Sequence, residues 1–148
     1  MNKQHLKETC TSIIRERIKT LELAMAESQV AANNETKSSS GDKYETTRAM
    51  NQLEKDMLAR QLSENNKELS SMIEIDCQHS SLTVIPGSLI DCGDTLFFIL
   101  GGLGKMQPEG KTLFVISPNA PLAKNLFSKT KGDRFLFNRQ ELEILDVM

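Results

Sequence analysis

The sequence predicts an α+β protein in which a long antiparallel coiled-coil hairpin of two helices, residues 1–76, precedes a small antiparallel β-sheet domain with one short helix, residues 82–148. Three observations carry this prediction. Apolar residues recur at steps of three and four through the N-terminal half, a spacing typical of helices. A loop rich in Asn and Ser, at about 33–42, interrupts that spacing. Beyond Ser81 the pattern changes to period two with β-branched and aromatic runs, as in strands.

The composition is that of a foldable chain without a strong electric field. Apolar residues make up 39% of the chain, charged residues 26%, and the formal net charge is −2. Lys and Arg number 11 against 13 Asp and Glu in residues 1–81, and 7 against 7 in residues 82–148. Such a chain has no global potential that would draw it onto nucleic acid or an anionic membrane. We expect any contact with nucleic acid to be local or to come through a protein partner.

Targeting and redox signals favour the cytoplasm. No apolar run approaches the roughly 20 residues that a membrane span needs, and the N-terminus lacks the apolar core of an export signal. The three cysteines are isolated, and with two histidines they show no metal-ligand spacing. We expect a cytoplasmic monomer with reduced cysteines and no membrane contact.

The first helix is predicted from Leu6 to about Ala32, a stretch without Pro or Gly. Its apolar residues fall on one stripe, with charged residues on the other faces. The stripe consists of Leu6, Cys10, Ile14, Ile18, Leu21 and Met25.

The second helix is predicted from Lys43 to about Ile73. Asp42 can act as its N-cap, with Glu45 three residues later in the manner of a capping box. Two helices of this length joined by a short turn favour an antiparallel hairpin on the order of 40 Å long, with the turn as its tip. The predicted stripe of this helix is Met50, Leu53, Met57 or Leu58, Leu62, Leu69 and Met72.

Six strands are predicted in the C-terminal domain. Their ranges are 81–86, 88–92, 95–100, 112–117, 134–138 and 141–147. A glycine-rich hairpin loop is predicted at 101–111, and a short helix within 117–133 begins near Pro121. All six phenylalanines fall in this domain, and we expect them to contribute to its core.

Glu35, Asp42 and Glu45 gather at the predicted tip. Exposed carboxylates can hold Mg²⁺ through one or two oxygens and leave its other positions to water or phosphate. The same residues also suit simpler roles, because Asp42 and Glu45 can cap the helix and Glu35 can be a solvated charge. Spacing alone favours the simpler roles over the metal site.

Other motifs are weaker. The run GGLGK at 101–105 lacks the longer form of a phosphate loop, and no nucleophile motif occurs. A modest basic cluster follows the predicted short helix, and it suits a solvated face and a contact with a partner or phosphate equally well. Its members are Lys124, Lys129, Lys131 and Arg134.

Two segments resemble the bacterial Gre transcript-cleavage factors. The more specific is 116–133, where the family shows Ser, a variable residue, Asp or Asn, a small residue, Pro, an apolar residue and Ala, and later a Gly-Asp turn. The matching residues are Ser117, Asn119, Ala120, Pro121, Leu122, Ala123, Gly132 and Asp133. The second segment, 43–54, resembles the start of the family's second helix and contains Tyr44.

The resemblance implies a fold and a function. By this resemblance the C-terminal domain of the chain would be FKBP-like and would bind RNA polymerase. The partner-binding residues would be Ser117, Asn119, Pro121 and Leu122. The coiled coil would enter the polymerase's secondary channel and meet the nucleic acid of the elongation complex there. Its tip acids would help to hold an Mg²⁺ shared with the polymerase, so that the polymerase cuts backtracked RNA. The protein would then be an accessory factor rather than an enzyme, without a stably bound cofactor.

The chain departs from the family at the tip. The family's two cleavage acids lie seven and four residues before the tip Tyr, and those positions are Lys37 and Ser40 here. A shifted tip would use Asp42, Glu45 and Glu35 instead. Four alternatives therefore stay open: a cleavage factor, a secondary-channel binder without cleavage activity, a prolyl isomerase, and a structural coiled-coil adaptor.

Overall fold

The computed structural model describes residues 1–35 and 41–148, although the side chains of residues 32, 34, 35 and 41–44 lie outside the described part. The chain divides into two compact units. One is Ser12–Leu69, and the other joins Met1–Thr11 to Ser70–Met148. The domain limits expected from the sequence, 1–76 and 82–148, stay a prediction.

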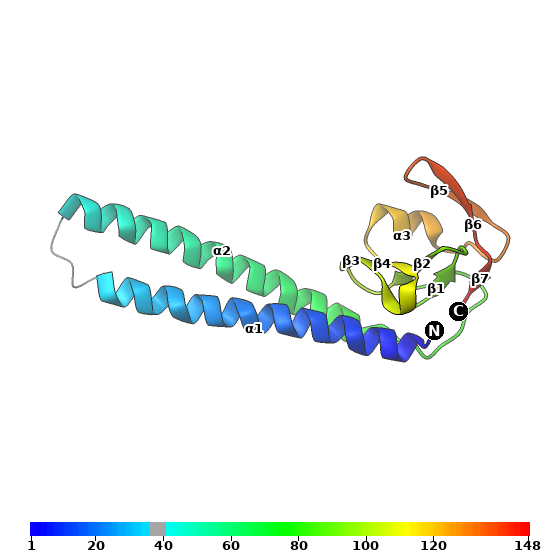
Figure 1. Ribbon diagram of the computed structural model, residues 1–148, viewed down its shortest axis with the longest axis horizontal. Coiled ribbons are helices and arrows are strands. Elements are labelled where there is room, and N and C mark those ends of the chain that lie inside the picture. The colour runs from blue at the N-terminus through cyan, green and yellow to red at the C-terminus, as the bar shows by residue number, and fades with distance from the viewer. Residues whose placement is uncertain (36–40) are drawn as a thin grey trace. The chain divides into compact units, whose positions relative to one another are not determined.

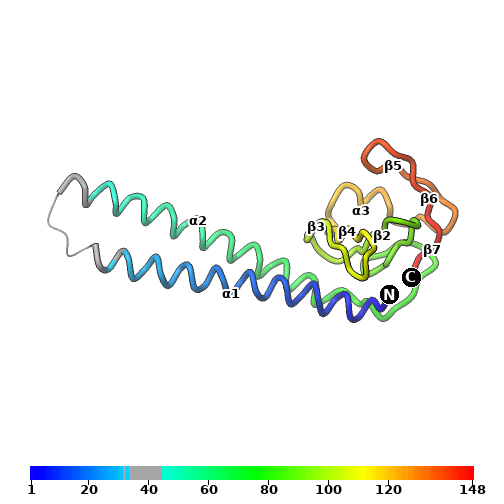
Figure 2. Tube along the Cα trace, viewed as in Figure 1, coloured from blue at the N-terminus to red at the C-terminus, as the bar shows by residue number. Residues whose placement is uncertain are grey.

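Two long N-terminal helices are confirmed. α1 spans Lys3–Glu35 and α2 spans Gly41–Glu74 (Figure 1). Within the unit Ser12–Leu69 the helices lie side by side (Figure 2), and Lys55 Nζ of α2 donates a hydrogen bond to Gln29 Oε1 of α1. Both helices run slightly beyond their predicted limits, because apolar periodicity marks only the turns that reach the buried stripe.

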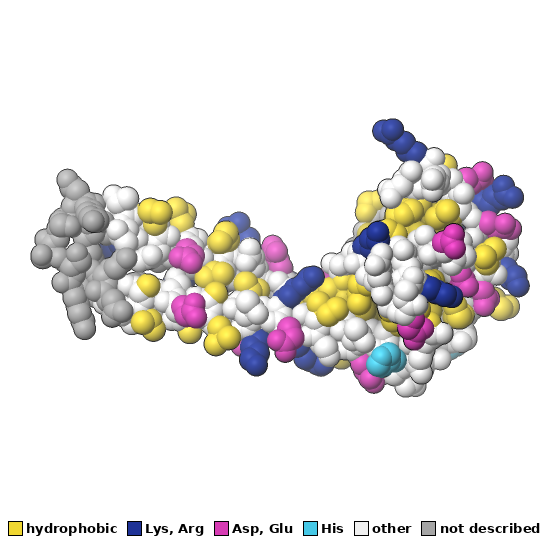
Figure 3. Space-filling model, in the orientation of Figure 1, with side chains coloured by type: hydrophobic (Ala, Val, Ile, Leu, Met, Phe, Trp, Pro, Cys, Tyr) yellow, Lys and Arg dark blue, Asp and Glu magenta, His cyan; other side chains and the backbone are white. Residues whose placement is uncertain are grey.

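The stripe predicted for α1 is confirmed, with its three N-terminal residues buried and the other three half-buried. The stripe predicted for α2 is wrong toward the helix N-terminus, where Met50 and Leu53 are 65% and 70% exposed. Two turns back from buried Leu58 the inward position is Asn51, which is half-buried. The sequence prediction names either Met57 or Leu58 as the next stripe residue. The structure buries Leu58 and leaves Met57 50% exposed. Position on the helix, more than hydrophobicity, decides burial here, and Figure 3 shows apolar side chains at the surface of both helices.

The C-terminal segment is a mixed sheet with a short helix, α3 (Pro121–Leu126), and a separate two-stranded sheet. The larger sheet has the order β3-β4-β2-β1-β7, and β5 pairs with β6. The strands are β1 (Leu89–Asp91), β2 (Thr95–Ile99), β3 (Gly104–Met106), β4 (Thr112–Ile116), β5 (Arg134–Phe137), β6 (Gln140–Glu143) and β7 (Asp146–Val147).

The expectation of a purely antiparallel sheet is wrong, because β2 and β4 are parallel neighbours, with Thr95 opposite Thr112 and Ile99 opposite Ile116. The chain leaves β2, passes to the sheet edge as β3, and returns antiparallel to β3 as β4. That return places β4 between β3 and β2, and it fixes the direction of β4 parallel to β2.

Three predicted segments need correction. Residues 81–86 form no named strand and contribute only an isolated bridge between Thr83 and Thr130. The predicted loop 101–111 contains β3 and a short 3₁₀ helix, η1 (Pro108–Gly110). The predicted strand 141–147 is two strands, because the backbone changes partners: Ile144 N donates to Asp133 O, and the next amide donates to Asp91 O.

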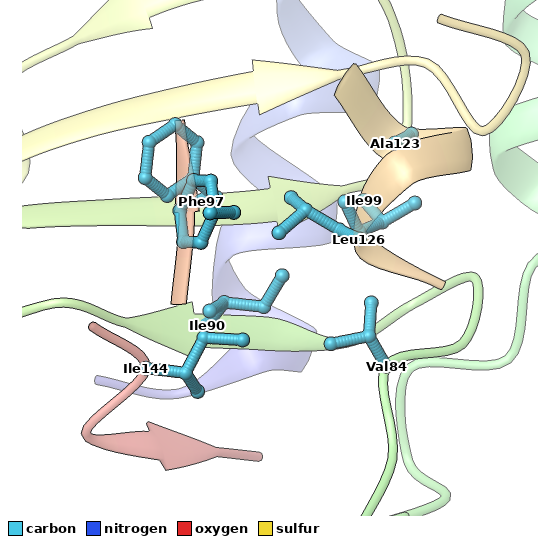
Figure 4. Close-up of a cluster of buried hydrophobic side chains, with 8 residues drawn as sticks. Val84, Ile90, Phe97, Ile99, Ala123, Leu126 and Ile144 are labelled. Carbon is cyan, nitrogen blue, oxygen red and sulfur yellow. The ribbon is translucent and has the colours of Figure 1, made fainter. Parts of the chain in front are cut away.

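One face of the larger sheet carries a core of aliphatic and aromatic side chains (Figure 4). Phe97 is its centre, with the rings of Phe114, Phe135 and Phe137 at centroid distances of 5.7, 5.5 and 5.0 Å. The expected contribution of phenylalanines to the core is confirmed. The buried members are Val84, Ile90, Phe97, Ile99, Ala123, Leu126, Phe135 and Ile144.

Along each strand, the residues next to these core residues point to the opposite face of the sheet. Several of them are also buried, so both faces of the sheet are covered. Among them are register partners Leu89 and Phe98, and Phe98 and Val115. The same compact unit contains the first turns of α1 and the end of α2. There Lys7 Nζ donates hydrogen bonds to Ile73 O at 2.9 Å and Ile75 O at 2.6 Å. The remaining buried apolar side chains of the unit are Leu6, Cys10, Met72, Cys77, Leu96, Leu100 and Leu113.

Candidate functional site

The acids predicted at the tip fall mostly outside the described side chains. α1 ends at Glu35 and α2 begins at Gly41, so Asp42 is in the first turn of α2. The side chains of Glu35 and Asp42, and with them the capping role of Asp42, lie outside the described part, whereas Glu45 is exposed on α2. Among the described residues no group of three or more His, Cys, Asp and Glu side chains is placed to hold a metal ion. The Mg²⁺ site at the tip stays a prediction.

The predicted partner-binding residues lie on one turn between β4 and α3. Ser117 Oγ accepts a hydrogen bond from Asn119 N at 3.2 Å, and Ser117 O accepts one from Ala120 N at 3.0 Å. Both bonds tie the turn to its own first residue. Asn119 is exposed, and these hydrogen bonds hold its backbone in place.

Pro121 begins α3, where a helix has no use for the missing amide proton. Its ring is exposed, whereas Leu122 and Ala120 are half-buried and pack against the core cluster. The predicted residues therefore divide into two kinds. Asn119 and Pro121 are available to a partner, and Leu122 anchors the turn to the core.

A second loop lies at the same end of the sheet, and sequence analysis did not assign it to the site. Residues 100–103 lead from β2 to β3 and must pass the end of β4, because β4 lies between those two strands. Leu100 N donates to Ile116 O at 3.0 Å, and Gly104 is opposite Val115 in the register of β3 with β4. We call residues 100–103 the arch. The signal for it was the run of glycines, but its place in the fold depends on the unpredicted parallel pairing.

The predicted basic cluster is spread over three elements. Lys124 is in α3, Lys129 and Lys131 follow it, and Arg134 begins β5. Arg134 is 3.9 Å from Glu141, but both side chains are 60% exposed, so the ion pair contributes little stability. Lys129 is held by its backbone, since its carbonyl accepts a hydrogen bond from Val84 N.

The three cysteines are free thiols. Burial, with a smaller contribution from the neighbouring Cys77, raises the pKa of Cys10 to about 11. Burial also raises the pKa of Cys77, and burial with the nearby Asp91 raises that of Cys92 to about 11. Thiols with such pKa values stay protonated near neutral pH, which makes them poor nucleophiles.

Taken together, the fold and the site define an α+β protein with two long helices and a small mixed-sheet unit that exposes a rigid polar turn. Comparison with family models, with curated proteins and with solved structures finds no match to this chain. None of the helices in the described part is both long and apolar enough to cross a membrane.

Proposed function

We propose that the chain is a Gre-like elongation factor that binds bacterial RNA polymerase through its C-terminal, FKBP-like domain. In this proposal α1 and α2 form an antiparallel coiled-coil hairpin that enters the secondary channel of the polymerase. The observation that carries the proposal is the Ser117–Pro121 turn. This segment resembles the family most specifically, and its Asn119 and Pro121 are exposed on a hydrogen-bonded backbone.

The long helices support the proposal by their composition. Inward positions from Leu6 to Met25 on α1 are buried or half-buried, and most other positions of the helix face solvent. Helices that bury only one stripe give little core for their length. Reach into a larger assembly accounts for helices that bury so little, since a helix of 33 or 34 residues is about 50 Å long.

The proposed activity depends on carboxylates near the tip. Carboxylate oxygens suit Mg²⁺, and Glu45 is an exposed one in the described part. A bound Mg²⁺ would supply a Lewis acid and an activated water for phosphodiester hydrolysis. The residues of this chain would orient and supplement ligands that the polymerase already provides.

A secondary-channel binder without cleavage activity is the second candidate. The observation that favours it is the presence of Lys37 and Ser40 where the family carries its two acids. A cation in that place would repel Mg²⁺ rather than bind it. Such a protein would occupy the channel and inhibit or otherwise regulate elongation.

RNA shortening in a backtracked polymerase complex separates the two candidates. A cleavage factor shortens the RNA, and the substitution Asp42→Ala should abolish this effect. The control is Glu27→Ala, which removes an exposed acid of α1 outside the predicted tip and should leave cleavage unchanged. A channel binder leaves the RNA intact but slows its cleavage by another factor. In that case the double variant Lys37→Asp, Ser40→Glu should gain cleavage activity.

Binding to core polymerase tests the proposal as a whole. The wild type should bind, and Pro121→Ala should weaken binding by about tenfold, the size expected for an anchor residue. Lys111→Ala, an exposed residue at the other end of β4, is the matched control. If the wild type shows no binding to the polymerase, the proposal is wrong.

A further inference from the structure

We propose that the arch, residues 100–103, and the turn 117–121 form one docking surface that receives an apolar side chain of RNA polymerase surrounded by acidic residues. This inference rests on the proposed function. It extends the surface beyond the residues that the family resemblance picks out, and it names the chemistry that the partner must offer.

Strand order places the arch and the turn at the same end of the sheet. β2 and β4 are parallel, so Leu100 and Ser117 leave the sheet at the same end, and the bond from Leu100 N to Ile116 O joins them there. The chain then crosses the end of β4 before pairing with its other side at Gly104. The arch is therefore fixed at one end by a hydrogen bond and at the other by strand pairing, both to the strand from which the turn departs.

The arch is itself ordered by a tight turn, in which Leu103 N donates to Gly101 O at 3.0 Å. Gly101 is buried, Gly102 is exposed, and Leu103 is half-buried. A leucine that keeps part of its surface in solvent on a short, hydrogen-bonded loop can bury more apolar area when a partner arrives, and it loses little conformational freedom on doing so.

The two chain segments that carry this surface have charges of one sign. Residues 100–107 and 117–132 contain four lysines and no Asp or Glu. Lys105 of β3 and Lys124 of α3 are both exposed, and they belong to the elements that follow the arch and the turn. The centre, with Gly102, Leu103 and Pro121, is uncharged. An uncharged centre with a basic surround complements an apolar residue ringed by carboxylates.

A protein surface fits these observations better than nucleic acid. Phosphate binding would need the lysines alone, whereas base stacking would need aromatic side chains, and the two segments contain one aromatic residue, the half-buried Phe127. The exposed part of the half-buried Leu103 can be covered favourably by an apolar partner group but not by a phosphate. Sensitivity of binding to Leu103 therefore distinguishes the two kinds of partner.

The test is the dissociation constant of the full chain for core RNA polymerase without nucleic acid, at two salt concentrations. Leu103→Glu should weaken binding at least about tenfold, and Leu103→Ala should weaken it several-fold. Lys105→Glu and Lys124→Glu should each weaken it several-fold and reduce its salt dependence. The matched controls are Leu82→Glu, at a leucine that is 86% exposed, and Lys111→Glu, at the opposite end of β4. Both should bind within about twofold of the wild type.

A photocrosslinking residue in place of Leu103 provides a second measurement that tolerates a weakened variant. It should capture a polymerase subunit at an acidic surface, and the same residue in place of Leu82 should not. Thermal melts identify any variant that has lost its fold. For such a variant the binding result is set aside, and the crosslink shows whether position 103 contacts the polymerase.

The outcomes separate the two proposals. Absence of binding by the wild type overturns the proposed function and this inference together. Normal binding by Leu103→Glu, with weakened binding by Pro121→Ala, overturns the arch alone. A crosslink from position 103 to RNA or DNA in an elongation complex, and none to protein, also overturns the inference.

Discussion

The two compact units bury their side chains in different ways. In Ser12–Leu69, the buried side chains of the described residues are Ile14, Ser28 and Leu58. The unit containing the sheet covers both faces of that sheet and packs four phenylalanine rings around one another. The helices are specified by local hydrogen bonds and one stripe, whereas the sheet depends on contacts between distant segments. Truncation of a buried side chain should therefore cost more in the sheet-containing unit than in Ser12–Leu69.

The largest expected effect is at the centre of the aromatic cluster. Phe97→Ala should lower the free energy of unfolding by about 3–5 kcal/mol, because it removes a fully buried ring that three other rings contact. Leu53→Ala in α2 should change it by no more than about 0.5 kcal/mol, because Leu53 is 70% exposed. Denaturant unfolding measures the free-energy change of each variant. Equal changes for Phe97→Ala and Leu53→Ala would contradict the difference in burial between the two units.

The next effect concerns backbone space within the sheet-containing unit. Gly87 has a φ of +90°, and a Cβ built there would come within 2.4 Å of the carbonyl oxygen of Asp76. Gly87→Ala should therefore cost about 2–4 kcal/mol. Gly110→Ala has a similar φ of +78° but open space around the added carbon, so its cost should be about 1 kcal/mol. Thermal unfolding of the two variants side by side tests the distinction, which disappears if both melt alike.

A smaller effect tests the register of α2. Leu58→Ala should cost about 2 kcal/mol, because Leu58 is 7% exposed in the stripe that faces α1. Its neighbour Met57 is 50% exposed, and Met57→Ala should stay within about 0.5 kcal/mol of the wild type. Helix content followed by circular dichroism during unfolding gives both values. The reverse order would mean that the other face of α2 points inward.

The smallest effect is a pH dependence in the sheet-containing unit. Burial, with Cys77 nearby, raises the pKa of Cys10 to about 11 from an ordinary 9.0. The folded state therefore favours the neutral thiol, and this contribution is complete below pH 9 and is lost as the pH rises from about 9 to 11. The wild type should lose more stability over that interval than Cys10→Ala does. Parallel pH profiles for the two proteins would show that Cys10 is not buried as a thiol.

Local patterns predicted the helices because helical spacing is itself local. The steps from Leu6 to Met25 define a stripe whether or not its partner is known. The same kind of pattern gave a wrong stripe for the N-terminal part of α2, where Asn51 rather than Met50 or Leu53 turns inward. The inward direction of α2 depends on where α1 lies, and hydrophobicity does not carry that information.

The sheet and the candidate site were less predictable for a related reason. β3 has three residues, Gly104–Met106, at a sheet edge, with neither β-branched nor aromatic character. Without β3, the direction of β4 and the position of the arch cannot be derived. Asn119 and Pro121, by contrast, were predicted from one continuous turn whose hydrogen bonds stay within a few residues.

The membership of Met1–Thr11 in the same unit as residues 70–148 has a consequence for synthesis on the ribosome. The first turns of α1 are made before α2, so Lys7 finds its acceptors at Ile73 and Ile75 only after both helices have been made. Leu6 and Cys10, which are buried in the finished unit, belong to the same early turns. The apolar side chains of these turns therefore stay unpaired with their final neighbours until residues more than 60 positions later have been added.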